Sequence, residues 1–159
     1  MASSVFRTIV TGWPDHTGPK LKEALMDAAS GTILPGHLID FNAGGSVIPH
    51  GASGSTVPVQ KMVAVEDPYV DAGTVGVIDT PYTVGELVRY IVPERGSTLY
   101  MILASGQNLI KGAAVTAAAN GQITGVTSAA TVHEEAIFGY LAEDKDASAG
   151  AERVQVEVA

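Results

Sequence analysis

Three short apolar runs within residues 82–126, each bounded by residues that favour turns, constrain the fold of this chain more than any other feature. Val, Ile, Tyr and Thr are dense inside the runs, whereas Gly, Pro, Asn and Ser lie between them. The runs cover residues 87–92, 99–103 and 113–115, and the turns cover residues 93–96, 105–108 and 120–121. Because β-branched and aromatic residues favour strands, the pattern predicts consecutive antiparallel strands joined by tight turns.

Further strands are expected on both sides of this stretch. Residues 153–158 read Arg-Val-Gln-Val-Glu-Val, which is the alternation of a half-buried strand. Further strand patterns cover residues 5–11, 33–40, 57–65 and 136–141, while residues 42–56 and 143–150 are expected to be surface loops. The chain is therefore predicted to be mainly β.

Residues 20–31 carry the one clear helical pattern. Pro19 suits the first helical position, and the apolar residues that follow recur at helical spacing. The stripe comprises Leu21, Ala24, Leu25 and Ala28, and Ser30-Gly31 ends it. A helix this short is marginal alone, so it is expected to pack against another element.

Residues 1–19 are expected to form an extended arm. Proline at positions 14 and 19 keeps the preceding residues out of the helical region. The only tryptophan of the chain, Trp13, lies in this arm. An apolar anchor on an arm favours docking on another chain, and the alternative is that Trp13 covers the core of its own domain.

An internal repeat is a further hypothesis, placed within a β-rich domain that covers residues 32–159. Residues 33–67 and 110–144 both run from a Gly-marked turn through two strands to a terminal Glu-Asp. The physical sense would be a repeated strand-turn-strand unit within a small β-barrel. The alternative is a chance alignment of glycine-rich β sequence.

Composition narrows the classes of function. The chain has 46% apolar residues, enough for a core, and only 16% charged residues, which favours a surface partly buried against partners. A net charge of -8 argues against nucleic acid as a direct ligand. The chain has no cysteine, no signal-peptide pattern and no apolar run near the ~20 residues of a membrane span, so no membrane partner is expected.

No motif predicts an enzyme, a cofactor or a metal. His133, Glu134 and Glu135 lack the further ligands and spacing of a metal site. Residues 144–150 begin like a calcium loop but lack its defining Gly and Glu. Residues 51–55 lack the Gly-Lys-Ser/Thr ending of a phosphate loop, and no Gly-x-Ser-x-Gly elbow exists.

The order of strands and turns resembles the head-decoration (cement) proteins of tailed bacteriophages. The residues that carry the resemblance are 81–86, 97–109, 112–113, 120–121, 136–140, 143–144 and 153–158. It implies a small antiparallel β-barrel or tulip-like domain on the outer surface of the virion capsid. It also implies that the protein bridges and stabilises major capsid protein subunits, and that it associates with itself as a trimer or a dimer.

The resemblance also implies that the N-terminal arm contacts the shell, with residues 5–10 able to add a strand to a capsid sheet. The expected contact residues are Val5, Phe6, Ile9, Trp13, Leu21 and Leu25. Another β-rich virion component, namely a tail tube, head-completion or fibre-attachment protein, is the alternative. A carbohydrate-binding module is the weaker alternative, because it needs more exposed aromatic platforms than Trp13 and the scattered tyrosines provide.

Overall fold

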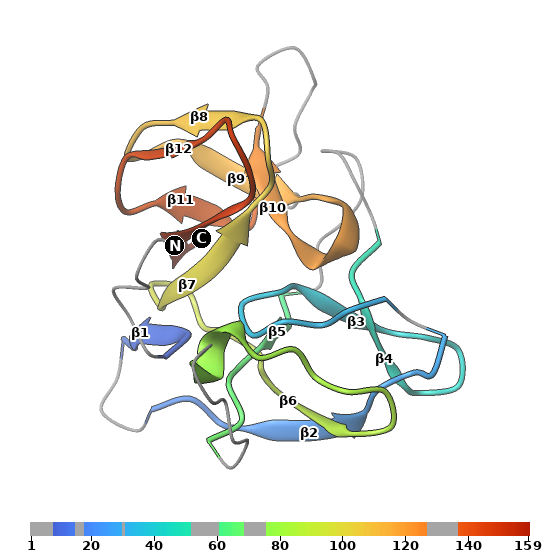
Figure 1. The fold of residues 1–159 in the computed structure, drawn as a ribbon. Helices are drawn as coiled ribbons and strands as arrows, with labels where there is room; N and C mark the ends of the chain where they lie inside the picture. The colour runs from blue at the N-terminus through green and yellow to red at the C-terminus, as the bar shows by residue number, and fades with distance from the viewer. Residues whose placement is uncertain (1–7, 15–17, 30, 52–60, 69–75, 127–136) are drawn as a thin grey trace.

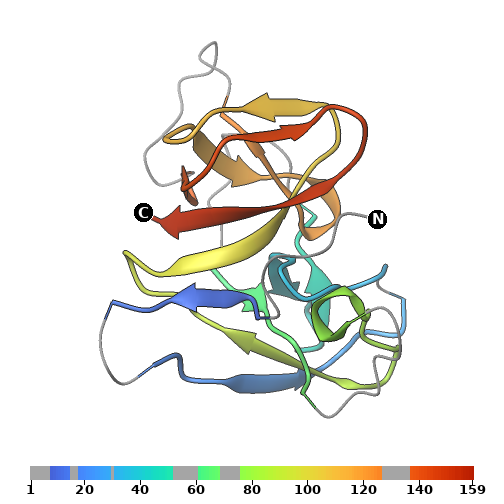
Figure 2. The same cartoon turned by 60° about the vertical axis from the view of Figure 1, so that its left-hand side comes forward.

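The chain folds into two stacked lobes, as seen in a computed structural model that describes residues 8–14, 18–29, 31–51, 61–68, 76–126 and 137–159. The later strands form a barrel in the upper part of Figure 1, and most of the earlier strands form a second lobe beneath it. The view in Figure 2 shows the same stacking from another side. In the described residues the helical content is two 3₁₀ turns, η1 (Val77–Asp79) and η2 (Ala119–Gly121), so the mainly β prediction is confirmed.

The strands are short, as expected for a chain punctuated by glycine and proline. They are β1 (Val10–Gly12), β2 (Lys22–Leu25), β3 (Ile39–Phe41), β4 (Val47–Pro49), β5 (Val63–Ala64), β6 (Leu87–Ile91), β7 (Thr98–Leu103), β8 (Gln107–Leu109), β9 (Ala114–Ala117), β10 (Ile123–Gly125), β11 (Gly139–Leu141), β12 (Lys145–Ala147) and β13 (Glu152–Val158).

The barrel is closed by five strands in the order β7-β10-β9-β11-β13, with β13 pairing back onto β7. The β7–β13 pair is the most extensive, running from Glu152 opposite Leu103 to Glu157 opposite Thr98. Four of the pairings are antiparallel, and β10 pairs with β7 in parallel. Closure leaves these strands without free edges, and the predicted β-barrel is confirmed.

The barrel interior is filled by alternate residues of its strands. Val154, Val156 and Val158 of β13 are buried, while the residues between them face outward. This is the alternation that the sequence predicts for residues 153–158. The larger side chains of the same cluster include Ile9, Leu99, Met101, Leu103, Ile123 and Phe138.

The second lobe is built from the sheet β2-β6-β5 and the hairpin β3-β4. It has a smaller core of its own, which includes Met26, Ile33, Ile39, Val47, Tyr82, Val88 and Tyr90. Leu38, Val63 and Ile91 of this lobe instead pack into the cluster of the barrel. The two lobes therefore share a continuous apolar contact.

The predicted helix at residues 20–31 is wrong, because β2 occupies this segment. β2 pairs antiparallel with β6, from Lys22 opposite Tyr90 to Leu25 opposite Leu87. Ala24 and Met26 face the core of the second lobe, so the burial follows a period of two residues. A helix of this length gains little stability alone, and pairing with β6 satisfies the backbone while burying Met26.

Residues 82–126 form strands as predicted, but these strands do not pair consecutively. The three apolar runs correspond to β6, β7 and β9. β6 lies in the sheet of the second lobe, whereas β7 and β9 lie in the barrel with β10 between them. The turn after β6 therefore carries the chain from one lobe into the other.

Two segments expected to be loops contain strands. β4 lies within residues 42–56, after a turn in which the Asn42 side chain accepts hydrogen bonds from the amides of Gly44 and Ser46. β12 lies within residues 143–150 and pairs with β8. The internal repeat and the division into domains stay predictions, since residues 52–60 and 127–136 lie outside the described part of the chain.

Candidate interaction surface

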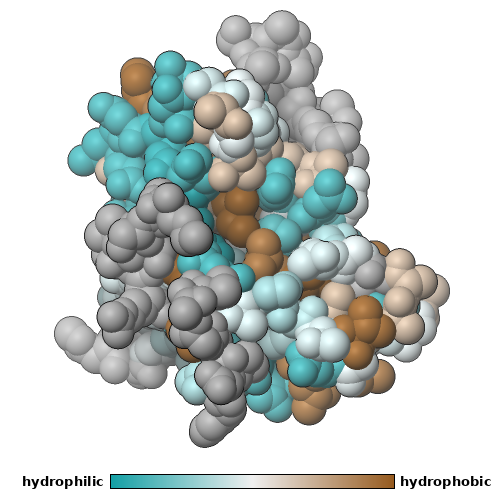
Figure 3. Space-filling model, in the orientation of Figure 1, coloured by the Kyte–Doolittle hydropathy of each residue, from teal (hydrophilic) through white to brown (hydrophobic). Residues whose placement is uncertain are grey.

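Large apolar side chains are exposed on the outer face of the sheet formed by β2 and β6. Leu21, Leu25 and Leu87 are 51%, 50% and 54% exposed, and Leu25 lies directly opposite Leu87. We call these three residues the β2–β6 face. They are exposed because Ala24 and Val88, which point to the other side, fill the core of the lobe. In Figure 3, brown apolar patches lie among teal surface toward the lower right, in the part of the molecule where Figure 1 places β2 and β6.

An ion pair lies across the same two strands. Arg89 and Glu23 stand opposite each other in the register, and the Arg89 Nε atom lies 3.3 Å from a Glu23 carboxylate oxygen. The leucines are therefore interrupted by a charge pair that is already neutralised. Burying this face against a partner would not bury an unpaired charge, which is the costlier case at an interface.

β2 also lies at the edge of its sheet. In the order β2-β6-β5, no strand among the described residues pairs with the other edge of Lys22–Leu25, whereas directly after β2 the Asp27 amide donates to the carbonyl of Val47 in β4. An unpaired edge presents backbone N–H and C=O groups that can accept an added strand. The apolar face and the free edge together make this side of the second lobe the best candidate for contact with another protein.

The structure separates the six residues that the sequence analysis predicted as contacts. Leu21 and Leu25 lie on the β2–β6 face, whereas Ile9 is fully buried in the barrel cluster. Val5 and Phe6 lie outside the described residues. Leu87 was missed, because only the pairing of β2 with β6 reveals that it stands beside Leu25.

Trp13 is partly buried and packs against the core of its own barrel, as the second of the two hypotheses for this residue expects. The segment before it is tied down as well, since Ile9 accepts a hydrogen bond from the Tyr100 amide at 2.7 Å and donates its own amide to Glu66 at 3.0 Å. β1 then pairs with β7. Removal of a segment that includes Ile9 and Trp13 would therefore disturb the barrel core.

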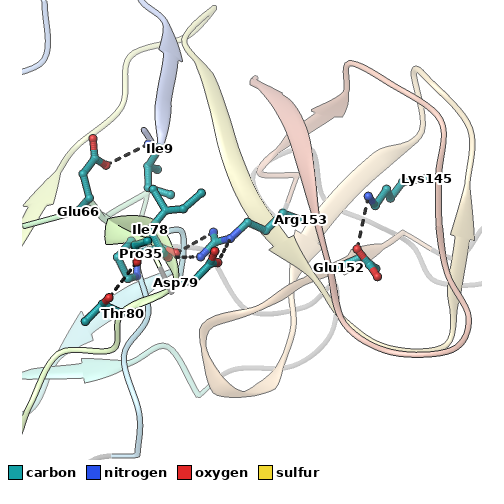
Figure 4. A network of polar contacts seen from close by, with 10 residues as sticks. Ile9, Pro35, Glu66, Ile78, Asp79, Thr80, Lys145, Glu152 and Arg153 are labelled. Carbon is teal, nitrogen blue, oxygen red and sulfur yellow. Dashed lines mark hydrogen bonds and ion pairs between the residues drawn. The ribbon is translucent and has the colours of Figure 1, made fainter. Parts of the chain in front are cut away.

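A cleft of about 350 Å³ lies where the two lobes meet. Its polar lining includes His37 and Asp79 of the second lobe and Arg153 of β13, while Leu34 and Ile102 supply apolar wall. Burial, and secondarily the Arg153 charge, lowers the pKa of the His37 imidazole to about 4. Figure 4 shows Arg153 reaching from the barrel to Asp79, Ile78 and Pro35. The donors of Arg153 are thus engaged within the chain.

The described residues contain no group of three or more His, Asp or Glu side chains arranged to hold a metal ion. Asp144 and Asp146, at the start of the calcium-loop-like segment, accept hydrogen bonds from the amides of Lys111 and Ser148. His133, Glu134 and Glu135 fall outside the described part of the chain. None of the helices within that part is long and apolar enough to cross a membrane.

Comparison with known proteins bears on the fold. No protein-family model matches the sequence, and no curated protein matches it. Among solved structures, the chain is similar to the head fiber gp8.5 N base of bacteriophage phi29, with a TM-score of 0.52 and 14% sequence identity. The match covers 88% of this chain and 95% of that one. The two-lobed β fold described above is therefore one that the base of a phage head fibre also adopts.

Proposed function

We propose that the protein is a structural component of a phage virion that binds the outer surface of the head. The observation that carries the proposal is the likeness to the head fibre base, because it extends over nearly the whole of both chains. The order of strands and turns in the sequence supports the same role independently. The role is non-enzymatic, with the major capsid protein as the partner.

The β2–β6 face is the proposed docking surface. It combines Leu21, Leu25 and Leu87 with a neutralised ion pair and the free edge of β2. Apolar burial at the centre of an interface supplies most of the affinity, and an added strand supplies backbone hydrogen bonds. Many copies on one shell would each need only a modest contact. Self-association, as a trimer or a dimer, is part of the proposal.

Two roles on the head surface are distinguished by what binding does to the shell. A decoration protein bridges capsid subunits and stabilises them, as the resemblance to head-decoration proteins implies. The base of a fibre binds the shell in order to hold an appendage, and the structural likeness favours this second role. The decoration role predicts that binding raises the heat resistance of the shell. The fibre-base role does not require that heat resistance rises.

The test uses phage heads assembled without this protein. The purified chain is mixed with them, unbound protein is removed by sedimentation, and bound copies are counted by gel densitometry before the heads are heated. Saturable binding supports the proposal, and a rise in the temperature of shell rupture assigns the decoration role. Binding without that rise assigns the fibre-base role. Absence of binding at micromolar concentration would overturn the proposal.

The double substitution Leu25→Thr and Leu87→Thr is expected to weaken binding to heads by at least about tenfold, because it removes the apolar centre of the docking surface. Threonine favours strands, so the free energy of unfolding should change by less than about 0.5 kcal/mol. Titration of heads with labelled protein measures the affinity.

The matched control is Ile110→Thr, which removes an apolar side chain that is 72% exposed and lies outside the β2–β6 face. This variant should bind heads like the unchanged protein. Equal affinity of the double variant and the unchanged protein would place the docking surface elsewhere. Equal weakening by Ile110→Thr would show that general surface hydrophobicity, and not this face, carries the contact.

A further inference from the structure

Arg153 joins the two lobes. Its side chain, 11% exposed, leaves the barrel strand β13 and donates from Nε to the Asp79 carboxylate at 2.9 Å. It also donates to the carbonyl of Pro35 at 3.0 Å and to the carbonyl of Ile78. Both carbonyls and the carboxylate belong to the second lobe, so one guanidinium holds three points of it (Figure 4). Charge-assisted hydrogen bonds of this kind are the strong ones in proteins.

The turn formed by residues 34–37 is one of the parts of the second lobe that contact the barrel. The amide of its last residue donates to the carbonyl of its first at 3.0 Å, and Pro35 and Gly36 occupy the central positions. Gly36 has a φ of 90°, which suits the third position of a type II turn. A Cβ there would lie 2.8 Å from the Tyr100 carbonyl and 2.9 Å from an Arg153 nitrogen. The backbone of the turn therefore sits directly on the barrel.

His37 ends this turn and is held as a neutral ring. It is 5% exposed, and its Nδ1 accepts a hydrogen bond from the Leu34 amide at 3.3 Å. A proton added at Nδ1 would replace the acceptor with a donor that faces the Leu34 N–H. It would also place a positive charge close to Arg153, which is why both burial and Arg153 oppose the charged form.

The charged groups around His37 do not provide a free carboxylate that could pair with a protonated His37 ring. β13 contributes Arg153 and Glu152, and Glu152 pairs with Lys145 at 3.6 Å. η1 contributes Asp79, which is engaged by Arg153. The segment after η2 contributes Gln122, which is neutral. His50, whose backbone contacts Leu38 and Gly121, has its ring 3.6 Å from Asp40.

We propose that the turn 34–37 and Arg153 form an acid-sensitive latch between the two lobes, which is released when His37 takes up a proton. The proton removes the hydrogen bond that shapes the turn, and the turn carries the Pro35 carbonyl that Arg153 holds. Release of the turn frees one of the three points held by Arg153 and widens the cleft. The latch is a property of the fold and does not depend on the proposed function.

The latch predicts a local loss of protection from hydrogen exchange on acidification. The reporters are the amides of Gly36, Leu38 and Ala64, which donate to the carbonyls of Ala64, Gly121 and His37. Between pH 7 and pH 5 their protection factors, corrected for the intrinsic exchange rate at each pH, should fall by about 20-fold. The reason is that the pKa of His37 is about 4 in the closed state and has its ordinary value of 6.5 when the turn is open. Amides of the β7–β13 pair, such as that of Val156, serve as the internal control and should keep their protection.

The substitution His37→Gln supplies the matched variant, because glutamine keeps a donor and an acceptor but does not titrate. In this variant the protection factors of the Gly36, Leu38 and Ala64 amides should not fall between pH 7 and pH 5. If this variant does not fold, Arg153→Lys provides the second test, because it should lower the protection of the same amides already at pH 7. The proposal would be contradicted if protection fell equally for the amides of the barrel. It would also be contradicted if the same fall in protection occurred in His37→Gln.

Discussion

Gly139→Ala is expected to lower the free energy of unfolding by about 3 kcal/mol, although replacing glycine by alanine in a strand is usually stabilising. Gly139 lies in β11, where it pairs with Val158 of β13 on one side and Val115 of β9 on the other. An added Cβ would lie 2.9 Å from Cγ1 of Val156 and closer still to the carbonyl oxygen of Glu157. A backbone atom cannot turn aside as a side chain can, so β11 and β13 would have to separate.

Gly150→Ala is the matched control for this prediction. Gly150 precedes β13, and a Cβ there would meet no atom within 4 Å. The change should be neutral or stabilise the protein by about 0.4–1 kcal/mol, since alanine reduces the entropy of the unfolded chain. Urea unfolding of both variants at one pH measures the difference. A Gly139→Ala variant as stable as Gly150→Ala would mean that the barrel is not closed between β11 and β13 as described.

The sequence predicts the main strands because the signals that identify a strand are local. Alternation in residues 153–158 identifies β13 and its buried side, and the density of Val, Ile, Leu and Tyr identifies β6 and β7. The partners of these strands are not local. Nothing in the composition of β6 and β7 distinguishes a hairpin from two strands of different sheets, so consecutive pairing was the simplest reading and was wrong.

The segment around β2 shows why the helix was predicted. Leu21, Ala24, Leu25 and Ala28 recur at helical spacing, yet Ala24 and Met26 also fit the period of a strand. Short segments satisfy both periods, and the partner decides between them. β6 supplies four paired residues and a core for Met26, which an isolated helix lacks. The two leucines then become exposed, which the helical pattern did not anticipate.

The latch could be predicted only in part. Pro35-Gly36 is a turn signal that can be read from the sequence, and residues 33–40 were expected to turn into a strand. The hydrogen bonds of the latch join Arg153 to Pro35, Ile78 and Asp79. These residues precede Arg153 in the sequence by 118, 75 and 74 positions. Long-range pairs of this kind leave no trace in composition or periodicity. The burial of Ile9 could not be predicted for the same reason, because it depends on the pairing of β1 with β7.

The stability of the folded protein is expected to fall by about 3 kcal/mol between pH 7 and pH 4 through His37 alone. Burial, and secondarily Arg153, lowers the pKa of His37 from 6.5 to about 4. In that interval the unfolded chain binds a proton that the folded chain does not, so unfolding takes up a proton and acid favours it. The contribution is fully present above pH 6.5, is lost as the pH falls towards 4, and changes no further below that value.

The measurement is the difference between the unchanged protein and His37→Gln in urea unfolding at pH 7, 6, 5 and 4. Carboxylates titrate over part of the same range, but they are common to both proteins and cancel in the difference. The two proteins should differ in slope, with the variant losing less stability in acid.

Parallel curves for the two proteins would contradict the prediction, because they would mean that His37 binds its proton equally well folded and unfolded. The sign of the difference is equally decisive. A variant that lost more stability in acid would imply that His37 gains a carboxylate partner on protonation, whereas the nearby carboxylates of Asp79 and Glu152 are engaged by Arg153 and Lys145. A shallower slope in the variant follows only if the neutral ring is what the folded state requires.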